Sequence, residues 1–141
     1  MKKTIFTAIA VMAILLISSC VSSGKQNSPE WAGIYHGVIP AADCPGISVV
    51  VILTTNHTYK ITNQYIDRGD GLLTYTGVFR WDEKSKTITL NSTEPSTGAK
   101  NEDSGVLIPD FKLRGQYLLY LDHEGKEITG QLADNYKLKR L

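Results

Sequence analysis

The sequence predicts an all-β domain, an antiparallel sandwich or barrel. Short apolar or alternating segments recur at spacings of about 8 to 12 residues, which is typical of such folds. Gly, Asn and Asp cluster between these segments, where turns are required. No stretch of the domain has the periodicity of an amphipathic helix.

Alternation and turn residues delimit the candidate strands. Three short polar segments, 55–57, 82–86 and 122–126, predict hairpins, so consecutive strands are expected to pair up and down. Residues 92–104 form the one long polar stretch and are expected to be a surface loop. The candidate strands are residues 32–38, 47–54, 58–66, 73–81, 87–91, 106–113, 117–121, 127–132 and 136–140.

One candidate strand is apolar on both faces. Residues 49–53 read Val-Val-Val-Ile-Leu, whereas half-buried strands alternate apolar and polar residues. One face is therefore expected in the core and the other beneath a cover. The covering group is a loop, a partner or lipid, and a loop is the favoured interpretation.

The first 19 residues have the pattern of a secretory signal peptide. Lys2 and Lys3 precede an apolar run over residues 5–17 that is broken only by Thr7. This run of 13 residues is shorter than the roughly 20 that a membrane-spanning helix needs. Cleavage after the segment is therefore the predicted outcome.

Residues 16–20, Leu-Ile-Ser-Ser-Cys, resemble the lipobox of bacterial lipoproteins. In that motif the cysteine thiol becomes a thioether to diacylglycerol, and the amine freed by cleavage is acylated as well. The resemblance implies a membrane anchor of several acyl chains at Cys20, followed over residues 20–29 by a flexible tether. Val21 stands in place of the Asp that retains enterobacterial lipoproteins at the inner membrane. It predicts the outer membrane, with the domain facing the periplasm.

The remaining composition excludes several classes of function. Loss of Lys2 and Lys3 with the signal peptide changes the formal charge from +1 to −1, so the domain has no basic footprint for nucleic acid. The chain has two cysteines, and once Cys20 carries lipid, Cys44 cannot form an intramolecular disulfide. Stability must then come from packing.

Residues 31–47, WAGIYHGVIPAADCPGI, resemble the N-terminal domain of the NlpE family of copper-resistance lipoproteins. That family's pattern is Tyr-x-Gly-x-Leu-Pro-Cys-Ala-Asp-Cys-x-Gly-Ile before an apolar strand. The likeness continues through YKITNQYI, GVFRW and YLLYLDHEGKEITGQLADNYKLKR to the C-terminus. It implies a lipocalin-like up-and-down barrel of about eight or nine strands over residues 30–141. The chain is expected to be a single-domain form of this family.

One substitution alters the chemistry of the motif. Ala41 stands where the family has the first cysteine of Cys-x-x-Cys, so neither a dithiol redox cycle nor a two-sulfur metal clamp can form with Cys44. This segment is expected to be a tight connection between two strands. Cys44 and His36 are weak metal candidates, whereas His57 and His123 are expected to be exposed in turns. No metal or other cofactor is predicted.

No catalytic motif is evident, so the chain is not expected to be an enzyme. The leading interpretation, implied by the family resemblance, is an envelope lipoprotein that acts in stress sensing or copper and envelope homeostasis through protein contacts. The second is a carrier that holds a small apolar ligand in its barrel. The third is metal binding. A hollow interior favours the carrier, an exposed apolar strand favours the interaction protein, and converging Cys44 and His side chains favour the metal.

Overall fold

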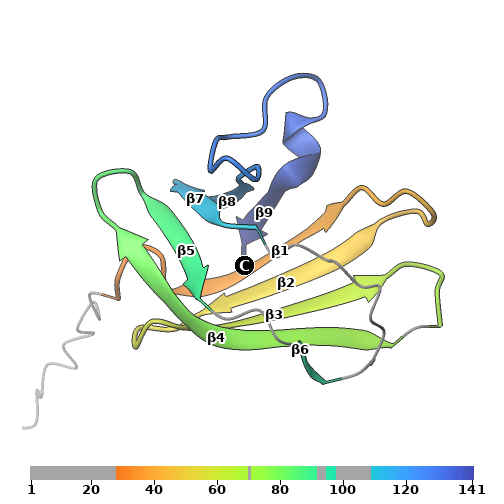
Figure 1. Cartoon of the computed structure of the whole chain (residues 1–141), viewed down its shortest axis with the longest axis horizontal. Coiled ribbons are helices and arrows are strands. Elements are labelled where there is room, and N and C mark those ends of the chain that lie inside the picture. Colours follow the sequence, from red (N-terminus) through yellow and green to blue (C-terminus); the bar gives the residue numbers. More distant parts are fainter. Residues whose placement is uncertain (1–27, 70, 92–94, 98–108) are drawn as a thin grey trace, which may run out of the picture.

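The structure is a computed structural model that describes residues 28–69, 71–91, 95–97 and 109–141 (Figure 1). Residues 1–27, with the predicted signal peptide and Cys20, lie outside this part. No helix of the described residues is long and apolar enough to cross a membrane. The strands are β1 (Gly33–Ile39), β2 (Ile47–Leu53), β3 (Thr58–Tyr65), β4 (Leu72–Asp82), β5 (Thr87–Asn91), β6 (Pro95–Thr97), β7 (Phe111–Arg114), β8 (Tyr117–Tyr120) and β9 (Lys137–Arg140).

All strand pairs are antiparallel, and the sheet closes on itself. Neighbours follow the order β3-β2-β1-β9-β8-β7-β5-β4, and pairing of β3 with β4 completes a ring of eight strands. Each strand lies beside its sequence neighbour, apart from the short β6, and β9 returns to β1. The predicted all-β, up-and-down barrel is confirmed. The seams β5–β7 and β1–β9 are the shortest of the ring, with two register pairs each.

One candidate strand is wrong, because residues 127–132 do not form a strand. Glu127 makes a single bridge with Leu121, and the extended backbone ends soon afterwards. Gly130 adopts a φ of 99°, in the left-handed region that extended strands do not use. A 3-10 helix, η1 (Ala133–Tyr136), then leads into β9.

The polar stretch 92–104 is not wholly a loop, because it contains β6. This short strand pairs with the N-terminal half of β4, beyond the part that β5 occupies. Residues 92–94 and 98–104 lie outside the described residues. So do residues 106–108 of the candidate strand 106–113, whose described part ends in β7.

The barrel interior is built from the alternate side chains of every long strand. Burial in β2 alternates strictly, with its odd-numbered residues buried and its even-numbered residues half-buried. Burying these apolar side chains provides the main favourable free energy of folding. One cluster contains Tyr35, Ile47, Val49, Val51, Leu53, Tyr59, Ile61, Leu73, Tyr75, Phe79, Ile88, Phe111, Leu113, Leu118, Tyr120 and Leu138.

Gly77 on β4 shows how closely this interior is packed. It pairs with Tyr59 across the sheet, and a Cβ at position 77 would lie 2.9 Å from Cε1 of the Tyr59 ring. The same Cβ would lie 2.7 Å from the carbonyl oxygen of Asn91. A glycine is therefore needed at position 77, because any side chain there would collide with the Tyr59 ring.

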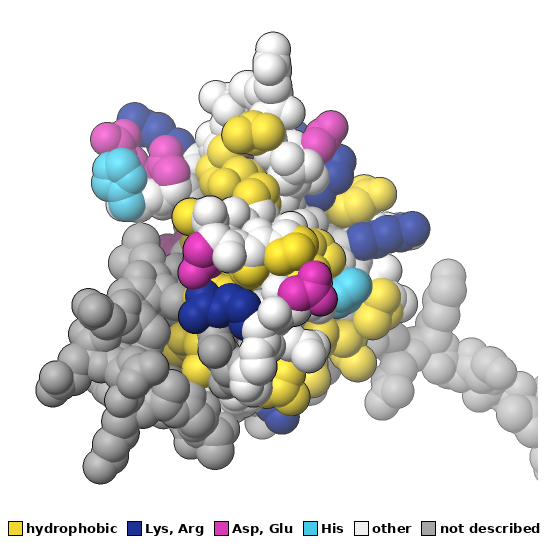
Figure 2. Space-filling model, turned by 90° about the vertical axis from the view of Figure 1, so that its right-hand side faces the viewer, with side chains coloured by type: hydrophobic (Ala, Val, Ile, Leu, Met, Phe, Trp, Pro, Cys, Tyr) yellow, Lys and Arg dark blue, Asp and Glu magenta, His cyan; other side chains and the backbone are white. Residues whose placement is uncertain are grey.

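The up-and-down order places alternate connections at opposite ends of the barrel (Figure 1). The N-terminal end carries residues 28–32 and the turns 54–57 and 83–86. The loop end carries the connections 40–46 and 121–136 and the described part of the connection between β3 and β4. Figure 2 looks onto the loop end, where apolar and charged side chains are interspersed.

Candidate functional site

The loop 40–46 joins β1 to β2 at the loop end and contains the remnant of the Cys-x-x-Cys motif. Cys44 is half-buried, and its thiol donates a hydrogen bond to the carbonyl oxygen of Gly46 at 3.2 Å. Ala41 packs against the hydrophobic core. The two motif positions therefore have different surroundings, and Ala41 contributes to packing where the family pattern has a thiol.

The loop 40–46 is fastened to the connection between β3 and β4. Arg68 forms an ion pair with Asp43 at 2.6 Å, and its guanidinium lies 5.0 Å from the centre of the Tyr65 ring. The backbone N–H of Ile66 donates to the carbonyl oxygen of Gly46. The tight connection predicted here is thus braced by a second loop. Sequence reasoning missed this contact, which joins residues far apart in the chain.

His36 and Cys44 have separate partners. His36 lies on the outer face of β1, where its Nε2 is 3.2 Å from the hydroxyl oxygen of Ser48 on β2. His57 and His123 are exposed in turns, as predicted. No group of three His, Cys, Asp or Glu side chains among the described residues could hold a metal ion. The weak metal candidates are therefore not part of a wider ligand cluster in this region.

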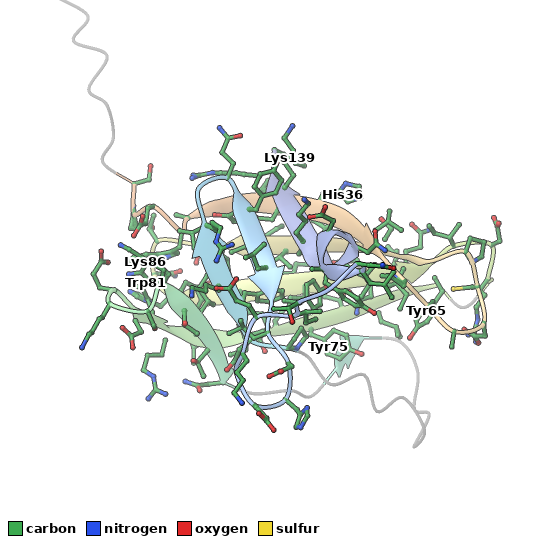
Figure 3. All side chains as sticks on the ribbon, turned by 90° about the horizontal axis from the view of Figure 1, so that it is seen from above. His36, Tyr65, Tyr75, Trp81, Lys86 and Lys139 are labelled. Atoms are coloured by element: carbon green, nitrogen blue, oxygen red, sulfur yellow. The ribbon has the colours of Figure 1, made fainter. Side chains whose placement is uncertain are left out.

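An apolar strip crosses the outer face of β1 and β2. We call Ile34, Val38, Val50 and Ile52 the β1–β2 strip. Ile34 and Val38 are 44% and 49% exposed. Val50 and Ile52, the outward residues of the segment for which the sequence predicts a cover, are half-buried. Figure 3 shows His36 and Lys139 on the same side of the barrel. In the sequence, the alternation along β1 could have predicted this strip, because Ile34 and Val38 lie an even number of residues apart and so share one face of the strand.

Aromatic rings gather at the N-terminal end of the barrel. The Trp31 ring lies 5.0 Å from that of His57, 5.2 Å from that of Trp81 and 6.2 Å from that of Phe79, between ring centres. The carbonyl oxygen of Trp31 also accepts a hydrogen bond from the hydroxyl of Tyr35. These contacts fasten the first described residues to the end of the barrel.

The interior also holds polar atoms. Asn63 is 6% exposed on β3, and its Oδ1 has no hydrogen-bond partner in the structure. Burial raises the pKa of Tyr59 and that of Tyr75, whose position Figure 3 marks together with Tyr65. A separate pocket of about 110 Å³ lies beside η1 and is lined by Tyr120, Glu127 and Asp134 among others, but not by Asn63. Buried acceptors normally bind a donor, and Asn63 Oδ1 has none among the described residues.

Fold and site together define a small closed antiparallel barrel whose motif loop lacks one of two cysteines. Comparison with known families agrees with this description. The family model described as the NlpE N-terminal domain matches residues 35–131. The chain belongs to this family, so the family resemblance seen in the sequence is confirmed.

Individual relatives show the same likeness. The curated protein Lipoprotein NlpE of Escherichia coli is 26% identical over 98% of this chain, and the chain spans 57% of that protein's length. A crystal structure of a protein described as a lipoprotein from Shewanella oneidensis is 31% identical, with a TM-score of 0.61, covering 82% of this chain and 94% of the other. The crystal structure of the Cpx pathway activator NlpE from Escherichia coli shares the fold, at 24% identity and a TM-score of 0.52, covering 70% and 46%.

Proposed function

We propose that this protein is a non-enzymatic lipoprotein of the bacterial envelope that acts in envelope stress sensing or in copper and envelope homeostasis through protein contacts. Family membership over residues 35–131 carries the proposal. The E. coli relative is described as an activator of the Cpx pathway, which is the basis for stress sensing here. Copper enters only through the family resemblance.

The anchor is the second part of the proposal. Residues 1–19 act as the signal peptide, Cys20 carries the lipid, residues 20–29 form the tether, and the domain covers 30–141. Val21 directs the protein to the outer membrane, where the domain faces the periplasm. The described chain begins at the N-terminal end of the barrel, which supports a tether that leaves from that end (Figure 1).

In this proposal, the signal is the membrane in which the protein resides. A chain that fails to leave the inner membrane presents its domain to a signalling partner there. Ala41 supports this reading, because a single thiol at Cys44 cannot run an intramolecular dithiol cycle. The hydrogen bond from Cys44 to Gly46 also gives this thiol a structural role in the loop.

The test uses E. coli cells that lack their own NlpE and carry a Cpx-pathway reporter. Val21→Asp, which should retain the protein at the inner membrane, is expected to raise the reporter. Adding Cys44→Ser should leave the response unchanged, and replacing the anchor with Cys20→Ala should remove it. A silent Val21→Asp variant at matched expression contradicts the proposal. Loss of the response with Cys44→Ser indicates a thiol sensor instead.

A second candidate is a carrier of a small apolar ligand. The unpartnered Oδ1 of Asn63 favours it, because a ligand with one donor group would satisfy this atom. Native mass spectrometry of protein taken from its own envelope should show a bound molecule if the barrel is loaded. Asn63→Leu should then release that molecule, whereas a mass that is fully accounted for by the lipidated chain would contradict the carrier.

A further inference from the structure

We infer that the β1–β2 strip is the docking surface for an envelope protein whose contact face has an apolar centre and an acidic rim. This inference rests on the proposed function and names the surface through which it works. Exposed single apolar residues are ordinary on protein surfaces, whereas contiguous patches mark interaction sites. Ile34, Ile52 and Val50 are contiguous, since Ile34 pairs directly with Ile52, and Val50 is the next outward residue on β2. Val38 pairs with Ser48 and joins the strip as the diagonal neighbour of Val50.

The outer faces of the two neighbouring strands are polar. The outward positions of β3 are polar, with Lys60 opposite Ile52 and Thr62 opposite Val50. On the other side, β9 places Lys139 opposite His36. The apolar strip is therefore bounded by polar strands on both sides.

The boundary is positively charged. Lys60 and Lys139 are exposed, and neither makes an ion pair with a described residue. None of the outward positions of β1, β2, β3 and β9 is Asp or Glu. A partner with acidic groups around an apolar centre would complement this pattern, which would speed association and exclude basic surfaces.

The centre of the strip has one fixed polar feature. His36 and Ser48 lie between Val50 and Val38 and are hydrogen-bonded to each other. A polar pair within an apolar surface sets the register of a partner that must match it. β1 is paired with β2 along its whole length and with β9 at Tyr35 and His36, so a partner has no free strand edge at the centre of the strip. It must dock by side-chain packing.

A protein partner fits this surface better than lipid does. Surfaces that lie in the membrane interface are enriched in Trp and Tyr, and the strip contains only Ile and Val. The two tryptophans, Trp31 and Trp81, lie together at the N-terminal end of the barrel. The strip runs along the side of the barrel, on β1, which begins at that end, and on β2, which ends there (Figure 1).

The first arm of the test uses the reporter cells described above. Ile34→Thr with Val38→Thr, in the Val21→Asp chain, keeps the β-branched shape and removes apolar surface. This pair should lower the response about tenfold, the change that a loss of roughly 1.4 kcal/mol in binding produces. Val78→Thr is the matched control, because Val78 is 52% exposed on the outer face of β4. A double variant that responds like this control overturns the inference.

The second arm does not depend on signalling. A photo-crosslinking residue is placed at position 38, or at position 78 as control, in the full lipidated chain in its envelope. Position 38 should give a protein adduct, identified by mass spectrometry, that Lys60→Glu with Lys139→Glu removes and that position 78 lacks. No adduct, an adduct to lipid, or an adduct of two copies of this chain overturns the inference. If the reporter is silent with the parent Val21→Asp chain, the proposed function fails, and this arm alone decides on the docking surface.

Discussion

Gly37→Ala should open the seam between β1 and β9. A Cβ at position 37 would lie 2.7 Å from the backbone carbonyl oxygen of Lys137 and 2.9 Å from Cδ2 of Leu138, which is fully buried. The oxygen can move only if β9 moves with it, so we take the upper end of the overpacking cost, about 3 kcal/mol. Replacing a strand glycine by alanine recovers about 0.5 to 1 kcal/mol of chain entropy. The expected net loss is about 2 kcal/mol, or roughly 10 °C in Tm.

Gly33→Ala is the matched control on the same strand. Its added Cβ would lie 2.7 Å from Nε of Arg140, a side-chain atom that can rotate away. The cost should stay within about 1 kcal/mol, since it is limited to the hydrogen bonds that Arg140 makes with residues 30 and 32. Urea unfolding followed by tryptophan fluorescence measures both variants. Equal stabilities for the two would refute the close approach of β9 to β1.

Four further outcomes are expected. Thermal melts with and without reductant or chelator should superimpose, because lipidation of Cys20, as proposed, leaves Cys44 without a second thiol, and the described residues hold no ligand cluster; a Tm that falls on chelation would contradict this. Trp31→Ala should cost about 2 kcal/mol in a urea titration, below the range for fully buried tryptophan because Trp31 is half-buried. Backbone N–H donors, first that of Lys126, lower the pKa of Asp122. The carboxylate therefore contributes its full stabilisation at any pH above the ordinary pKa of about 4, and this contribution is lost as the pH falls through the lowered pKa. Stability titrations should therefore show the parent losing stability in acid relative to Asp122→Asn. Finally, Cys20→Ala should move the mature protein from the detergent phase to the aqueous phase; a variant that still matures to its normal size and stays in the membrane fraction would refute lipidation.

Local patterns predicted most of the strands. The strands β2 to β5 agree with the candidate segments to within a residue or two, because alternation and turn residues act over short stretches of chain. The segment 127–132 failed because its apolar residues alternate like those of a strand. Gly130 turns the backbone there, and Leu132 is 60% exposed. Nor could composition reveal β6, since its pairing depends on how far β4 extends beyond β5.

The candidate site was likewise predicted only in part. Ala41 and Cys44 were identified from the motif, and the structure then gave the two side chains different surroundings. The contact of Asp43 with Arg68 was not predictable, because 25 residues separate the pair along the chain.

The sequence by itself determined the fold class, the strand order implied by short turns, and the family, because these depend on local periodicity and on motif residues. Only the tertiary structure decided that β9 returns to β1 and closes the ring, because this contact joins the two ends of the domain. It also decided which apolar side chains stay outside. In β2 both faces are apolar, so periodicity alone cannot tell the core-facing Val49 from the outward Val50. Barrel closure places one in the interior and the other on the strip, since successive residues of a strand point to opposite faces.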